Sequence, residues 1–184
     1  TQSDRMTGKN GSWHIELDGI SQETALKIAE RDDVVSIGAV TIFNPDGELP
    51  YRMDGKRVVL YGIDESYLTM NSTGAAEGRF PQGMGEIMLS SNAARVLQVA
   101  VGDTVTLRTP SGDWDFTVSG LGGVEESYYS GQYSLMDAYL PRTAFAALME
   151  QNNVHNLQTS YYVQFTSASK AAKAIPELTA QHNL

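Results

Sequence analysis

The stretch GEIMLSSNAARVLQVAVGDTVTL, residues 85–107, passes from a short apolar strand through a helical turn to a Val-Gly-Asp turn and a second strand. The serines Ser90 and Ser91 precede the helical pattern, and serine is a preferred helix N-cap. Asp103 is predicted to be a turn residue and not an acid catalyst. The stretch contains no nucleophile motif, metal cluster or phosphate loop. Its residues therefore indicate regular architecture without chemistry.

The sequence on both sides of this stretch predicts a β-rich middle region. The segment RVVLYGID reads as one strand, and TVTLRT and DWDFTVSGL are predicted to form a hairpin around residues 109–112. We expect only two short helices here, one from about Ser91 to Val99 and one that begins near Pro141, a residue that suits a first helical turn. Strong turn signals separate the strands at residues 44–47, 53–56 and 110–113.

The two ends of the chain share a different pattern, a strand followed by a helix. WHIELDGI alternates apolar and polar residues, Ser21 is a candidate N-cap, and VVSIGAVTIF is a β-branched strand. Near the carboxyl end, TSYYVQF alternates as a strand and SASKAAKAIPELTA is helical, with Pro176 expected to kink or restart the helix. The sequence therefore predicts an α+β fold: one α/β lobe from residues 1–45 and 150–184, and an inserted β-rich lobe from residues 46–149.

Composition excludes several classes of function. The chain has 184 residues and 41% hydrophobic content, which suits one domain or two small lobes that share a core. Its net charge of −9 argues against general nucleic-acid binding and against docking on anionic lipid through a basic patch. The absence of cysteine excludes thiol catalysis, disulfides and cysteine-ligated metals. No apolar run reaches the ~20 residues needed to span a bilayer, and the polar, abrupt ends suggest a fragment of a larger protein.

No catalytic or cofactor motif stands out in the sequence. His14, His155 and His182 are far apart and have no metal-ligand spacing, so we expect surface or strand roles for them. The adjacent Glu125 and Glu126 are expected in a solvated loop, because neighbours on an extended chain point in opposite directions. Serine-hydrolase elbows, phosphate loops and dinucleotide-binding glycine patterns are missing. We therefore expect no enzyme activity, no cofactor and no metal.

The segment EESYYSGQYS, residues 125–134, is the candidate contact surface of the chain. It carries Tyr128, Tyr129 and Tyr133, and tyrosine supplies a large rigid ring with one polar tip. These three tyrosines are candidate partner contacts. The alternative, that one or two of the rings pack inward from a strand, stays open.

The order of motifs from Gly78 to Leu121 resembles the extracytoplasmic core domain of MacB/FtsX-like ABC transporter permeases. The string reads G-R-F-P, then G-E-I-M-L-S-S-N-A-A-R-V-L, then V-G-D-T-V-T-L, then F-T-V-S-G-L. Two further segments resemble elements of the same family: YGIDESYL at residues 61–68 and SLMDAYLP at residues 134–141. The order and spacing of these motifs carry the resemblance, which covers most of the chain.

The resemblance implies a domain between the first and second transmembrane helices of a permease, with an α/β porter-like lobe and an inserted mostly-β lobe. Its implied role is to couple cytoplasmic ATP hydrolysis to export or to mechanical signalling outside the membrane. Candidate tasks are export of peptides or drugs, lipoprotein release and activation of a cell-wall enzyme. The domain would lie on the extracytoplasmic face of the bacterial cell membrane, anchored by flanking transmembrane helices absent from this fragment.

The implied partners are the chain's own transmembrane helices and a cytoplasmic ATPase subunit or domain, but no nucleic acid. A second permease copy and an extracytoplasmic adaptor protein are further candidates. The alternative function is a freestanding extracytoplasmic peptide- or sugar-binding module, and a hydrolase with an unrecognised site is a third reading. The parent gene separates them: apolar helices before Thr1 and after Leu184 support a permease, and a signal peptide directly before Thr1 supports the binding module.

Overall fold

The computed structural model of the chain describes residues 13–43, 50–71, 75–123 and 136–182. Helices and strands both contribute to these ranges and confirm the predicted α+β class. In chain order the elements are β1 (Ile15–Asp18), α1 (Gln22–Ala29), β2 (Val34–Phe43), β3 (Arg52–Met53), β4 (Lys56–Ile63), α2 (Glu65–Asn71), β5 (Ala75–Gly78), β6 (Glu86–Leu89), α3 (Ser91–Leu97), β7 (Thr104–Thr109), β8 (Gly112–Gly122), β9 (Met136–Pro141), α4 (Arg142–Gln151), β10 (Leu157–Phe165) and α5 (Ala168–His182).

Six strands of the middle region form a closed barrel. Strand β4 pairs with β3, β3 with β7, β7 with β8, β8 with β6 and β6 with β9, and β9 returns to pair in parallel with β4. Side chains alternate between its inside and outside: Val105 and Leu107 of β7 are buried in the barrel core, whereas Thr104, Thr106 and Arg108 are exposed. The parity of a residue in its strand therefore decides whether it faces the barrel core.

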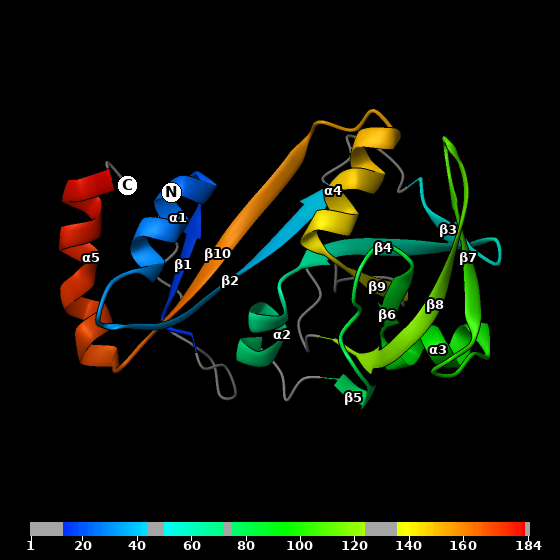
Figure 1. Ribbon diagram of the computed structural model, residues 1–184, viewed down its shortest axis with the longest axis horizontal. Helices are drawn as coiled ribbons and strands as arrows, with labels where there is room; N and C mark the ends of the chain where they lie inside the picture. Colours follow the sequence, from blue (N-terminus) through cyan, green and yellow to red (C-terminus); the bar gives the residue numbers. More distant parts are fainter. Residues whose placement is uncertain (1–12, 44–49, 72–74, 124–135, 183–184) are drawn as a thin grey trace.

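The first and last described strands build a second layer. Strand β10 lies between β1 and β2, antiparallel to both, and α1 and α5 pack on this three-stranded layer. We call β1, β2, β10, α1 and α5 the terminal layer. Its core combines residues from both ends of the chain: Leu17, Ala25, Ile28, Ala39, Tyr161, Val163, Phe165, Ala171, Ala174 and Leu178. Figure 1 shows α1 and α5 at one end of the long axis of the molecule and the β7–β8 hairpin at the other.

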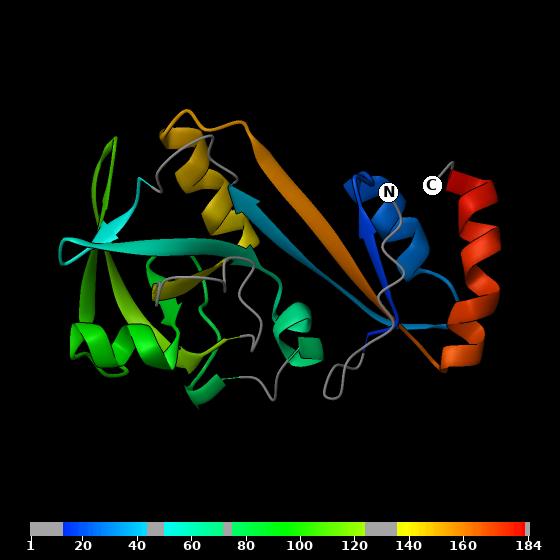
Figure 2. The same ribbon diagram turned by 180° about the vertical axis from the view of Figure 1, so that it is seen from behind.

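One continuous sheet joins the terminal layer to the barrel. Residues Val40–Ile42 of β2 pair with Tyr61–Ile63 of β4, on the edge of β4 that is not occupied by β9. In Figures 1 and 2, β2 and β10 run as two long strands from the helices of the terminal layer to the barrel. A third apolar cluster lies between the two bodies and combines Val40 and Tyr162 with Tyr61 and Tyr67.

The local signals in the sequence hold in the structure. Ser21 and Ser90 are N-caps, each accepting a hydrogen bond from the backbone three residues on. The β7–β8 hairpin has the predicted turn, with Thr109 opposite Gly112. Asp103 serves the turn as expected, because its Oδ2 accepts a hydrogen bond from the Ala100 N–H at 2.8 Å.

Two expectations about helices were wrong or incomplete. The middle region contains the additional helix α2, which the sequence did not predict because Glu65–Asn71 includes a β-branched residue and an aromatic one, both of lower helix propensity. Burial of Tyr67, Leu68 and Met70 stabilises this helix through tertiary packing. Helix α5 continues through Pro176 and does not restart there.

Candidate functional site

The candidate contact residues Tyr128, Tyr129 and Tyr133 lie outside the described residues. Within the described ranges, no group of three or more histidine, aspartate or glutamate side chains is placed to hold a metal ion. The histidine nearest the amino end has a role in the sheet: His14 Nδ1 accepts a hydrogen bond from the Phe165 N–H at 3.0 Å. The candidate site described below lies where the terminal layer meets the barrel.

Asp64 completes the sheet at this meeting point. It follows β4 directly, and its backbone N–H donates to the Ala39 carbonyl of β2 at 3.0 Å. Its side-chain Oδ2 accepts a hydrogen bond from the Ala39 N–H at 2.9 Å. The carboxylate therefore takes the role that a backbone carbonyl would have if β4 continued. The same Oδ2 accepts from the Arg142 guanidinium at 3.2 Å. One carboxylate therefore ties together β2, the end of β4 and the start of α4.

Helix α2 rests directly on β2 beside this carboxylate. Ser66 Oγ donates to the Ile37 carbonyl at 2.8 Å. A Cβ atom built on Gly38 would lie 2.7 Å from Ser66 Oγ and 2.8 Å from Tyr67 Cα. The contact between α4 and β4 is similarly close, because a Cβ atom on Gly62 would lie 2.7 Å from Phe145 Cβ. Glycine in a strand interior here permits close approach of a helix.

The Arg142 side chain also reaches the terminal layer. Its guanidinium carbon lies 5.5 Å from the centroid of the Tyr161 ring on β10, within the range of a cation–π interaction. Arg142 Nε is buried and has no hydrogen-bond partner among the described residues. We call the set of Gly38, Ala39, Asp64, Arg142 and Tyr161 the junction.

Sequence reasoning missed the junction. Its members come from β2, α4, β10 and the residue that follows β4, and only register and packing bring them together. Two signals were available: a glycine at position 38 inside a β-branched strand, and an aspartate at position 64 directly after one. Neither signal indicates which distant residue it will contact, so neither predicts the site.

A half-buried carboxyl lies on the outer face of the barrel. Asp137 of β9 pairs with Val59 in the sheet and lies on the same outer face as the stacked rings of Tyr61 and Tyr139, whose centroids are 5.3 Å apart. Asp137 Oδ1 is buried without a hydrogen-bond partner among the described residues. Burial raises the pKa of Asp137 to about 6, and a hydrogen bond from Tyr61 opposes this shift.

We expect Asp137→Asn to stabilise the chain at neutral pH. A folded-state pKa of about 6, above the ordinary 3.8, means that the folded state loses stability as pH rises from about 4 to about 6 and stays penalised above that range. Asparagine removes the charge and keeps an acceptor for Tyr61. Since part of Asp137 stays in contact with solvent, we expect a gain of about 1 to 2 kcal/mol at pH 7.5. Urea unfolding measures it.

The gain should nearly vanish at pH 4, where the native carboxyl is protonated in the folded state and half protonated in the unfolded state. An equal difference between variant and native chain at both pH values would contradict the assigned cause.

Comparisons with known proteins place the chain in a family. Residues 2–181 match the family described as MacB-like periplasmic core domain. The crystal structure of the periplasmic region of MacB from Actinobacillus actinomycetemcomitans is similar, with a TM-score of 0.60 and 15% identity over 91% of this chain and 76% of that one. A permease-protein domain from Porphyromonas gingivalis has a TM-score of 0.53 and 16% identity over 85% of this chain and 75% of that one.

At these identities the two solved structures support the fold alone. Comparison with curated protein sequences gives no significant match. In the part of the chain that the structure describes, no helix is long and apolar enough to cross a membrane. The family match spans nearly the whole chain and agrees with the motif order from Gly78 to Leu121. The chain belongs to the family of MacB-like periplasmic core domains, a module of ABC transporter permeases.

Proposed function

We propose that this domain couples ATP hydrolysis in the cytoplasm to export or to mechanical signalling outside the membrane. The junction carries the proposal. The first and last described elements, β1 and α5, belong to the terminal layer, and the barrel is fixed to that layer through Asp64 and Arg142. A displacement of the first and last described elements would therefore move the barrel, because the connection is a continuous sheet with α2 packed on β2 and α4 packed on β4.

The two-lobe division supports the same function. We propose that residues 1–45 and 150–184 act as a porter-like α/β lobe and residues 46–149 as an inserted β-rich lobe. Separate apolar cores support this division: one contains Leu17 and Leu178, and the other lies inside the barrel and contains Leu107 and Phe116. The cluster around Tyr61 and Tyr162 spans both parts and would transmit force between them.

The proposed setting is the extracytoplasmic face of the bacterial cell membrane, with transmembrane helices flanking the domain. Its partners would be those helices and a cytoplasmic ATPase subunit or domain, with a second permease copy or an extracytoplasmic adaptor as further candidates. Family membership supports this setting.

The proposed coupling can be tested by Arg142→Gln in the whole permease, reconstituted with its ATPase. This substitution removes the ion pair with Asp64 and the contact with Tyr161. We expect ATP hydrolysis to persist while ATP-dependent export or signalling falls severalfold. The matched control is Arg95→Gln on α3, an exposed arginine that bonds only to its own helix neighbour Asn92 in the described structure. Equal activity of both variants and the native permease would overturn the proposed coupling.

We further propose that Tyr128, Tyr129 and Tyr133 contact a partner. Replacing all three by alanine should leave the melting temperature of the isolated domain nearly unchanged and impair transport in cells. Calorimetry and a cell-based transport assay measure the two effects. A large fall in melting temperature would show that the rings are core residues, and unchanged transport would remove the contact role.

A further inference from the structure

Three arginines lie side by side across three neighbouring strands of the barrel. Arg57 of β4 is directly opposite Arg52 of β3, and Arg52 is directly opposite Arg108 of β7. Each arginine has a sequence neighbour that faces the inside of the barrel: Val58, Met53 and Leu107. Successive side chains of a strand point to opposite faces. The three arginines therefore project from its outer surface, and we call them the arginine row.

The row is unusual for this chain. The protein carries a net charge of −9, and like charges directly opposite each other across strands are destabilising. Arg52 and Arg57 also make contacts within the chain, so the distinguishing feature is the alignment of the row and not an unpaired charge. At the end of the row, Arg108 Nε lies 3.4 Å from an oxygen of Asp113, and these side chains are 76% and 51% exposed. Such an exposed pair contributes little and exchanges readily for a partner's carboxylate.

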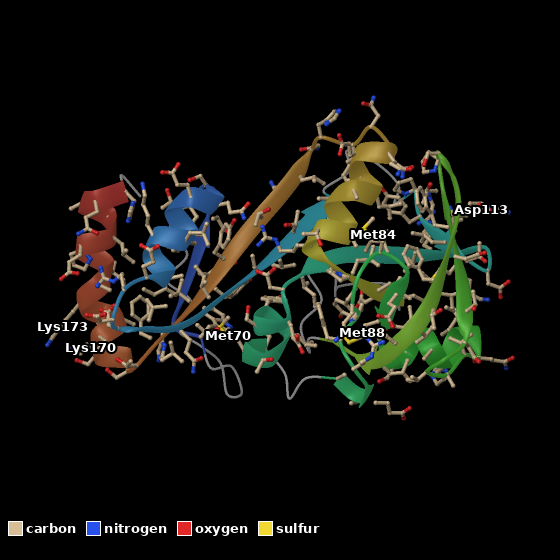
Figure 3. The ribbon with its side chains drawn as sticks, in the orientation of Figure 1. Met70, Met84, Met88, Asp113, Lys170 and Lys173 are labelled. Atoms are coloured by element: carbon tan, nitrogen blue, oxygen red, sulfur yellow. The ribbon has the colours of Figure 1, made fainter. Side chains whose placement is uncertain are left out.

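The row lies far from the terminal layer. In Figure 3, Asp113 is at one end of the molecule, whereas Lys170 and Lys173 of α5 are at the opposite end. The first and last described elements, β1 and α5, both belong to the terminal layer. If the chain is anchored in a membrane at its ends, as proposed above, the arginine row points away from the lipid and toward soluble protein.

The spacing of the row indicates the shape of the partner. Cβ atoms of residues directly opposite each other on neighbouring strands are about 4.5–5.5 Å apart. Residues at i and i+4 on a helix are about 5–6 Å apart, so a helix laid across the strands can present one carboxylate to each arginine. Guanidinium groups bind carboxylates with two parallel hydrogen bonds, and arginine is enriched in protein interfaces.

We propose that the arginine row binds an acidic helix of an extracytoplasmic protein partner, with carboxylates at successive i, i+4 positions. The proposal deepens the proposed function by giving the chemistry of one partner. Asp113 holds Arg108 until the partner's carboxylate replaces it.

The test uses the chain of residues 1–184 and an alanine-based helical peptide with glutamates at successive i, i+4 positions. The control peptide has the same composition with its glutamates spread around the helix. We expect fluorescence anisotropy to detect tighter binding of the striped peptide. The double variant Arg52→Glu with Arg108→Glu should weaken that binding at least about tenfold. Asp113→Asn should strengthen it about two- to threefold, because it releases Arg108.

A second double variant, Lys170→Glu with Lys173→Glu, changes the net charge by the same amount at the opposite end of the molecule. It should weaken binding less than about twofold if the row is a local site. Equal losses in the two double variants, or equal binding of the two peptides, would overturn the proposal. If the glutamate variant fails to fold, Arg52→Lys with Arg108→Lys keeps the charge and removes the forked geometry, and an intermediate loss is expected.

Two further measurements test whether something other than an acidic helix binds the arginine row. Row-dependent dimerisation in sedimentation would assign the surface to a second copy of this chain. Row-dependent binding to vesicles of phosphatidylcholine and phosphatidylglycerol would assign it to lipid. Either result would overturn the acidic-helix partner. None of these measurements involves ATP or transport, so a failure here leaves the Arg142 test of coupling unaffected.

Discussion

Replacing Gly38 by alanine is expected to lower the free energy of unfolding by about 3 kcal/mol. The added methyl group would lie 2.7 Å from Ser66 Oγ and 2.8 Å from Tyr67 Cα, well inside contact distance. The Tyr67 part of this obstacle is backbone, which cannot rotate away as the Ser66 side chain can. Helix α2 is also held in place, because Ser66 donates to the Ile37 carbonyl and the Asp64 N–H donates to the Ala39 carbonyl. Urea unfolding would show a lower midpoint with an unchanged slope.

Gly85→Ala is the matched control. A Cβ atom at Gly85 meets no heavy atom within 4 Å, and its backbone does not need the left-handed region. Alanine there should be neutral or stabilise by up to about 1 kcal/mol, since it reduces the freedom of the unfolded chain. Similar stability of the Gly38 and Gly85 variants would mean that α2 does not pack closely on β2.

Replacing Asp64 by alanine is expected to cost about 2 to 3 kcal/mol. Ala39 is fully buried, and its N–H would lose the Asp64 carboxylate as its acceptor. Arg142, whose side chain is 23% exposed, would lose its carboxylate partner at the same time. The Ala39 N–H would lose this acceptor in a fully buried position, and this is the costly way to break a hydrogen bond. The ion pair adds less, because the Arg142 and Asp64 side chains are 23% and 37% exposed. Chemical unfolding at neutral pH measures the change.

Two comparisons separate the contributions. Asp64→Asn keeps an acceptor for the Ala39 N–H and removes the charge, so it should cost less than alanine. Asp113→Ala removes an exposed carboxylate from Arg108 and should change stability by less than about 0.5 kcal/mol. If the Asp64 and Asp113 alanine variants were equally stable, the junction would be an ordinary surface contact.

The sequence predicted the features that depend on neighbours along the chain. The hairpin of β7 and β8 follows from alternation and a tight turn, and Ser21 and Ser90 cap helices within three residues. Features that join distant segments were not predictable in this way. Barrel closure pairs Val58 with Met136, and no local pattern in either strand specifies the other. The family resemblance rests on the order and spacing of several motifs together, because each motif alone is not specific.

The candidate sites show the same limit. Only residue type and a neighbouring glycine indicate the three tyrosines as contacts, and they lie outside the described residues. The arginine row has no counterpart in the linear sequence, because Arg52, Arg57 and Arg108 become neighbours only through strand register. The junction depends on close contacts at Gly38 and on a carboxylate that substitutes for a strand. Such contacts follow from three-dimensional packing and not from periodicity.

The pairing of β1 with β10 determines the order in which parts of the domain can fold while the chain is synthesised from its amino end. Ile15 is the register partner of Val163, the His14 N–H donates to the Val163 carbonyl, and β10 is the strand that pairs with β1. Strand β1 can therefore pair only after β10 has been synthesised, when almost the whole domain has been made. Every strand of the barrel precedes β10 in the chain, so the barrel can close first. The terminal layer is then the last part to assemble, and a chain cut short before residue 157 leaves β1 without its neighbour in the sheet.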